Sequence, residues 1–214
     1  MSPHRRVVMS VAALAAIFTL TVAGCGRRDR LTFTDEETGR TWFPAPNGRY
    51  GLQIVQDPRQ GVQEVWFRHL RDEDADTLVD RLNGPASLSW APDSEFVVIN
   101  HRDYASLHDF LLLRRDRRGI HEVGGMMDRV QELWQRLYPE PMQRMAFLGV
   151  RWDTESDDTR LMVVGIGQPG EDPNVLVRQA FWLNPADSVV RLAENPPELM
   201  SMRSPFAAGP AAAP

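Results

Sequence analysis

Lysine is absent from the 214-residue sequence, and cysteine occurs once, at Cys25. Without lysine the chain cannot form a Schiff base or use a phosphate-loop lysine, and one cysteine supports neither a disulfide framework nor a CxxC metal site. The 29 acidic residues outnumber the 24 basic ones, all of them arginine, which gives a formal net charge of −5. This balance argues against a nucleic-acid partner, because such a protein needs a basic face to replace the counterions of phosphate.

The N-terminus has the pattern of a secretory signal. His4-Arg5-Arg6 precedes an apolar run from Val7 to Val22, and small residues follow it. A charged segment, a short apolar segment and small residues together predict export and removal of the signal. As a permanent span the run is short, because sixteen residues at about 1.5 Å each cover about 24 Å of a hydrocarbon core roughly 30 Å thick.

The signal ends in Val22-Ala23-Gly24-Cys25, which resembles the lipobox of bacterial lipoproteins. The resemblance implies that the Cys25 thiol receives a diacylglyceryl group, that a signal peptidase cuts before it, and that the new N-terminus is acylated, for example with palmitate. Two or more acyl chains anchor a protein stably, whereas one binds only marginally. The alternative is an ordinary signal cut near Ala23 or Gly24, which leaves Cys25 as a free thiol. A twin-arginine signal at Arg5-Arg6 is a further alternative.

The residues after Cys25 bear on the membrane that holds the anchor. Gly26 follows the cysteine, and in the enteric sorting rule a residue other than aspartate implies transfer to the outer membrane. Removal of residues 1–24 takes two arginines and no acid, so residues 25–214 carry a net charge of −7. Residues 25–30 are a lipidated tether with three arginines, each worth about 1 kcal/mol of attraction to an anionic surface, or they are simply a solvated linker.

Residues 31–195 have the pattern of a β-rich globular domain. Apolar segments alternate with turn residues, as in short strands joined by hairpins. We therefore expect a mainly β fold, an antiparallel meander of hairpins. The expected strands are Leu31–Thr34, Arg40–Phe43, Tyr50–Val55, Gln63–Leu70, Ser87–Trp90, Glu95–Asn100, Asp109–Arg114, Gly119–Val123, Ala146–Trp152, Arg160–Ile166, Val175–Leu183 and Val189–Ala193.

Helical spacing appears in one segment. Apolar residues between Met126 and Leu137 recur at intervals of three and four, and Pro139 ends the run, which predicts one amphipathic helix near residues 126–138. A weaker helical pattern covers Asp74–Leu82. Residues 196–214 are rich in proline and alanine, and we expect this tail to be disordered because it has few large apolar side chains to offset its ordering entropy.

Residues 87–99, Ser-Leu-Ser-Trp-Ala-Pro-Asp-Ser-Glu-Phe-Val-Val-Ile, resemble the inner hairpin of a β-propeller blade of the Tol-system and WD-repeat type. Ser94 stands where that family usually has glycine. Trp42, Trp66 and Trp90 lie at equal intervals of 24, but the residues between them do not align as repeats. A complete ring needs at least four blades of about 40–45 residues. The resemblance therefore implies blade-like hairpins in an incomplete or open arrangement.

One polar segment follows that hairpin and concentrates histidine, carboxylate and hydroxyl groups, the types needed for metal binding or acid–base chemistry. Its candidate ligand-binding residues are Asn100, His101, Asp103, His108 and Asp109. A catalytic triad there is disfavoured, because adjacent strand residues such as His108 and Asp109 face opposite sides. The alternative is a polar connection whose acids stabilise turns.

Two other motifs resemble binding sites, but the residues around them do not suit the ligand. The sequence therefore predicts no metal site and no cofactor. Gly165-Ile166-Gly167-Gln168-Pro169-Gly170 matches the dinucleotide fingerprint, but prolines and acids follow it where a helix N-terminus and phosphate would have to lie. The aspartates from Asp72 to Asp80 have calcium-loop spacing, but the required glycine and glutamate are missing.

Three hypotheses of function follow. The first is a non-catalytic, lipid-anchored lipoprotein of the bacterial envelope, with its domain in the periplasm or at the surface and an envelope protein or small ligand as partner. The second is a periplasmic hydrolase or metal-dependent enzyme that uses the polar segment from Asn100 to Asp109. The third is a structural role in envelope integrity.

Overall fold

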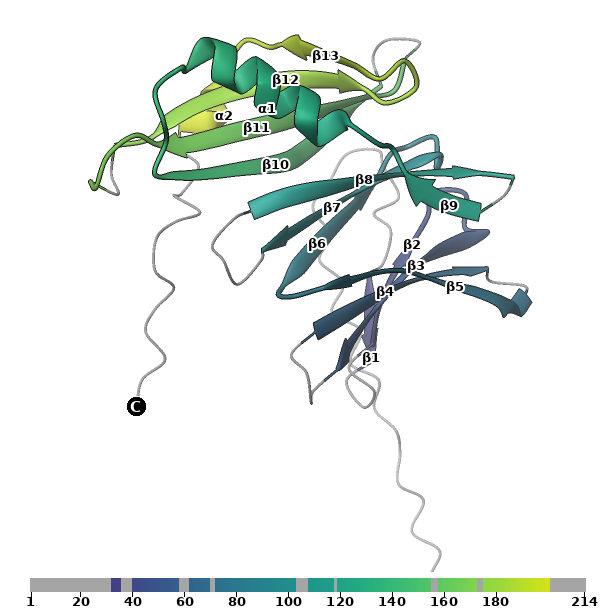
Figure 1. The fold of residues 1–214 in the computed structure, drawn as a ribbon. Coiled ribbons are helices and arrows are strands. Elements are labelled where there is room, and N and C mark those ends of the chain that lie inside the picture. Colours follow the sequence, from purple (N-terminus) through teal and green to yellow (C-terminus); the bar gives the residue numbers. More distant parts are fainter. Residues whose placement is uncertain are drawn as a thin grey trace, which may run out of the picture.

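The computed structural model describes residues 32–35, 40–57, 62–69, 72–102, 108–117, 119–154, 158–172 and 175–200. Within these ranges the chain forms thirteen strands and two helices (Figure 1). The elements are β1 (Phe33–Asp35), β2 (Arg40–Pro44), β3 (Tyr50–Asp57), β4 (Val62–His69), β5 (Asp72–Leu82), β6 (Ala86–Trp90), β7 (Phe96–Arg102), β8 (His108–Asp116), β9 (Gly119–Glu122), α1 (Met126–Leu137), β10 (Arg144–Asp153), β11 (Arg160–Gln168), β12 (Val177–Asn184), β13 (Val189–Leu192) and α2 (Pro197–Met200). The predicted mainly β fold, the antiparallel meander and the helix near 126–138 are confirmed.

The strands form three consecutive antiparallel meanders of four strands, which we call the first unit (β2–β5), the second unit (β6–β9) and the third unit (β10–β13). The strand β1 extends the first unit at its β2 edge. The second and third units are joined by one parallel bridge between Ala146 and His108. Each unit is thus a chain of hairpins, as the regular alternation of apolar segments and turns predicts.

The second unit lies between the other two (Figure 1). Val97 and Ile99 of β7 pack into a core shared with the first unit, whereas Val98 packs into a core shared with the third. All three side chains are at most 1% exposed. A strand buried on both faces reads as a continuous apolar run, which is the reason that β7 and β8 show no alternation in the sequence.

The helix α1 contributes Met126, Val130 and Trp134 to the core between the second and third units. Gly165 and Gly167 of β11 make room for the Trp134 ring, because a Cβ built at either glycine would lie 2.6 and 2.7 Å, respectively, from ring atoms. Two glycines of the apparent dinucleotide fingerprint therefore serve packing, and both lie within a strand.

Two hairpin turns repeat the same geometry 46 positions apart. Ala45 and Ala91 each accept a hydrogen bond from the residue three positions on, at 2.9 and 3.0 Å. The residues at that third position, Gly48 and Ser94, have φ values of 63° and 67°. The repeated turn therefore relates the first unit to the second. Its interval of 46 positions differs from the interval of 24 between the tryptophans.

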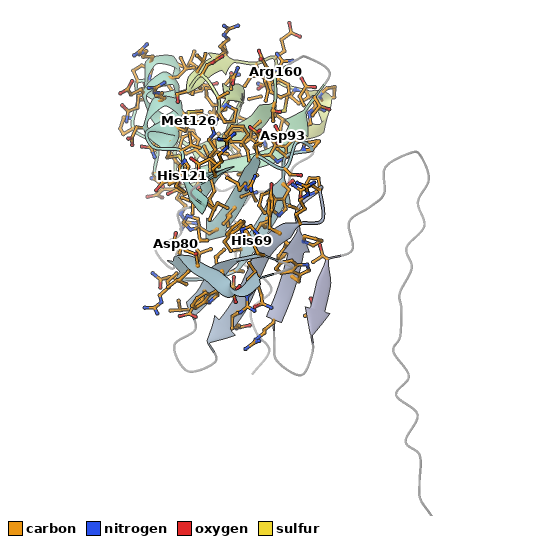
Figure 2. All side chains as sticks on the ribbon, turned by 90° about the vertical axis from the view of Figure 1, so that its right-hand side faces the viewer. His69, Asp80, Asp93, His121, Met126 and Arg160 are labelled. Carbon is orange, nitrogen blue, oxygen red and sulfur yellow. The ribbon has the colours of Figure 1, made fainter. Side chains whose placement is uncertain are left out.

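The turns also touch one another. The Tyr50 hydroxyl donates to the Ser94 carbonyl at 2.6 Å, and the Asn47 backbone N–H donates to the Ser94 hydroxyl at 3.0 Å. Asp93 accepts a hydrogen bond from Thr159, in the turn between β10 and β11. Figure 2 shows Asp93 of the second unit lying beside the third unit. The β2–β3, β6–β7 and β10–β11 turns are therefore in contact in succession.

Two expectations are wrong in detail. The helical pattern at Asp74–Leu82 lies in the strand β5, where pairing with β4 outweighs the weak helical periodicity. Within the predicted tail, residues 197–200 form α2, and Leu199 is buried at 3% exposure against the third unit. The globular part therefore extends to residue 200. Residues 201–214, the predicted signal and the tether lie outside the described residues.

Candidate functional site

The predicted polar site lies where β7 ends and β8 begins. His101 and Asp109 are cross-strand partners, so their side chains leave the same face of the second unit as neighbours. Asn100 lies on the opposite face, because successive strand residues alternate. Asp103 and the side chain of His108 lie outside the described residues. Of the five candidates, the structure thus brings together His101 and Asp109.

The side chain of Asn100 links two units. Its Nδ2 donates to the Gly149 carbonyl at 2.8 Å, and its Oδ1 accepts from the Gly149 N–H at 2.7 Å. An amide side chain that bonds both groups of one residue replaces a missing strand partner, here between β7 and β10. Asn100 therefore has a structural role that sequence reasoning did not identify.

His101 and Asp109 are both partly buried, and Asp109 already has an interaction partner. A neighbouring imidazole and carboxylate can bind a polar group or share a proton. Among the described residues, no group of three or more histidine, cysteine, aspartate or glutamate side chains is placed to hold a metal ion. Ligand binding at this pair stays a prediction.

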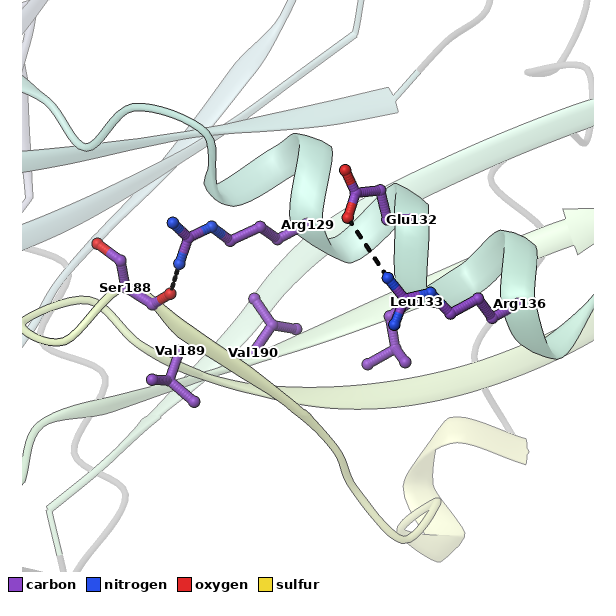
Figure 3. Close-up of a pocket in the computed structure, with 7 residues that line it drawn as sticks. All are labelled: Arg129, Glu132, Leu133, Arg136, Ser188, Val189 and Val190. Atoms are coloured by element: carbon purple, nitrogen blue, oxygen red, sulfur yellow. Dashed lines mark hydrogen bonds and ion pairs between the residues drawn. The ribbon is translucent and has the colours of Figure 1, made fainter.

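A groove of about 290 Å³ separates α1 from the start of β13 (Figure 3). Leu133 and Val190 contribute apolar surface, and Arg129 reaches across to donate to the Ser188 carbonyl. Arg136 lies 3.7 Å from Glu132, and both side chains are mostly exposed. Since its charged groups are paired or solvated, the groove is a seam between helix and sheet that the Arg129 side chain spans.

A second cavity, of about 200 Å³, opens beside Trp182 on the outer surface of the third unit. The guanidinium carbons of Arg160 and Arg151 lie 5.3 and 5.8 Å from the centre of the Trp182 ring. Arg160 also contacts Asp153 at 2.7 Å. Both distances are in the range of cation–π contacts, so the two arginines pack against this ring. In the sequence, the alternation of residues along β12 was the only sign that Trp182 and the two arginines would lie together.

No family model matches the chain, and no curated protein matches its sequence. Among the described residues, no helix is long and apolar enough to cross a membrane.

Proposed function

We propose that the chain is a lipid-anchored, non-catalytic binding protein of the bacterial envelope. The observation that carries the proposal is the position of the sole cysteine, Cys25, directly after Val22-Ala23-Gly24 and an apolar run of signal length. The only cysteine of an exported chain would rarely occupy this position by chance. Acylation with two or more chains is what makes such an anchor stable. The residue Gly26 favours the outer membrane over the inner one.

A binding role is supported by the form of the domain. Three small sheets are stacked into a layered core, and the outer faces of the first and third units carry tryptophan, arginine and carboxylate side chains. Surfaces of this kind recognise partners through aromatic and charge-assisted contacts. The pair His101 and Asp109 is a further candidate for a contact with a ligand.

The proposal is tested by mass spectrometry of the mature N-terminus. We expect a chain that begins at Cys25 and carries a diacylglyceryl group and an amide-linked acyl chain. The Cys25→Ala variant should keep residues 1–24 and should lack acyl groups, although its folded domain is unchanged. An unmodified Cys25 thiol in the mature wild-type chain would contradict the anchor, and with it the localisation.

A further inference from the structure

The outer face of the first unit carries a row of side chains that the core does not use. Trp42, Gln53, Trp66 and Leu78 are successive cross-strand partners on β2, β3, β4 and β5. Their strand neighbours, such as Leu52 and Phe67, point into the core shared with the second unit. The row therefore lies on the opposite side, and we call it the indole face.

Both indoles of this face are held in place. The Trp42 ring lies over Gly51, where a built Cβ would be 2.7 Å from ring atoms, so glycine alone leaves space for it. The Trp66 Nε1 donates at 3.1 Å to Glu64, two residues earlier on the same strand. Both side chains are half-buried. A ring that rests on the backbone of its own sheet presents its other face outward, as a platform and not as a projecting wedge.

The charges beside the platform neutralise one another. Arg68 lies 3.3 Å from Asp76, and Arg81 lies 3.1 Å from Glu64. Glu64 and Arg81 are cross-strand partners on one side of the row. Arg68 lies two residues after Trp66 on β4 and Asp76 two residues before Leu78 on β5, which places this pair on the other side. A face of paired charges is complementary to a neutral ligand rich in hydrogen-bonding groups, and a strongly anionic polymer would have to disrupt the pairs.

Two polar atoms on this face lack a partner. Gln53 Oε1, between the two indoles, and Arg68 Nε are shielded from solvent and have no hydrogen bond among the described groups. Buried polar atoms without a partner are rare in proteins. A ligand whose hydroxyl groups enter beside the indoles, with a small rotation of these side chains, would supply the missing hydrogen bonds.

We propose that the indole face binds an extended, β-linked glycan, with sugar rings stacked on Trp42 and Trp66. The strands β2 and β4 are separated by β3, so the two indoles start from positions about 10 Å apart, which is two inter-strand spacings. The Trp42 ring leans over Gly51 of β3, so the two rings lie within the reach of a few consecutive sugars of one extended chain. This proposal rests on the proposed function, because it names the ligand of the envelope binding domain.

Binding is measured with the full chain in detergent, by sedimentation with insoluble cell-wall glycan and by titration with a chitin hexasaccharide. We expect Trp42→Ala and Trp66→Ala each to weaken binding about tenfold, the effect of losing one aromatic contact. Trp42→Phe and Trp66→Phe should keep most of the affinity, because a smaller ring still stacks. Trp152→Ala is the matched control. It removes a half-buried indole whose N–H is also bonded, to Ser89, but which lies between the second and third units.

Thermal unfolding midpoints of all variants show whether a loss of binding reflects a loss of fold. The Cys25→Ala chain separates this proposal from the anchor, since glycan binding should persist without acyl groups. Failure of the wild-type chain to bind either glycan overturns the glycan site and leaves the anchor untouched. If Trp42→Ala and Trp66→Ala instead leave glycan binding unchanged, or dissociate a dimer, the face has another occupant and the glycan proposal is wrong.

Discussion

Single residues decide how the turns of neighbouring units fit together. Tyr50 is 2% exposed, and its hydroxyl donates to the Ser94 carbonyl while it accepts from Asn47 Nδ2 at 2.9 Å. The guanidinium carbon of Arg115 lies 4.6 Å from the centre of its ring. One tyrosine thus satisfies polar groups of two turns that are far apart in sequence.

Replacing Tyr50 by phenylalanine tests this contact. The Tyr50→Phe variant keeps the ring but leaves the Ser94 carbonyl and the Asn47 amide without their partner, so the free energy of unfolding should fall by about 1–3 kcal/mol. Urea denaturation followed by circular dichroism measures the change. An unchanged midpoint would show that water replaces the hydroxyl and that the turns do not depend on it.

At the scale of elements, the sequence shows which segments are strands, but it does not show which side chains of other elements pack against them. Twelve strand segments and the helix are legible from alternation and from spacings of three and four. The burial of β11 on both faces cannot be read from the sequence. Gly165 and Gly167 look like part of a loop motif, and only the structure shows that the Trp134 ring packs against them. The role of Asn100 is hidden for the same reason, since Gly149 is 49 residues away.

The seating of α1 on β11 gives a prediction at this scale. Gly165→Ala places a methyl group against the Trp134 ring and should lower the free energy of unfolding by about 1–3 kcal/mol through overpacking. In the Gly165→Ala and Trp134→Phe double variant the smaller ring should recover part of the loss, so the two effects should not add. Gly170→Ala is the control, because a Cβ there would meet no atom within 4 Å. Equal losses from both glycine variants would contradict the fit.

At the scale of the whole molecule, the second unit makes the fold cooperative. Its residues belong to both large cores, with Ile99 facing the first unit and Leu112 facing the third. A layer that contributes to two cores couples them, because neither core persists when that layer unfolds.

We therefore expect Ile99→Ala and Leu112→Ala each to lower stability by about 2–5 kcal/mol, and each to shift a single unfolding transition. Leu192→Ala, at a residue 52% exposed, should change stability by less than about 0.5 kcal/mol. Near-ultraviolet circular dichroism and calorimetry follow the transition. Two separated transitions in either core variant would show that the units unfold independently.

The sequence by itself determined the class of the fold, the strand segments, the helix and the predicted anchor, because these depend on local patterns of apolar residues, turns and small residues. The tertiary structure decided the layering, the meeting of the turns, the separation of Asn100 from His101 and the indole face. These features arise from contacts between residues distant in sequence, where a single alternating strand does not reveal which of its faces will be covered. Trp42 and Trp66 read as ordinary strand residues, and only the register of β2, β3 and β4 places them in one row, on either side of Gln53, on the outer face of the first unit.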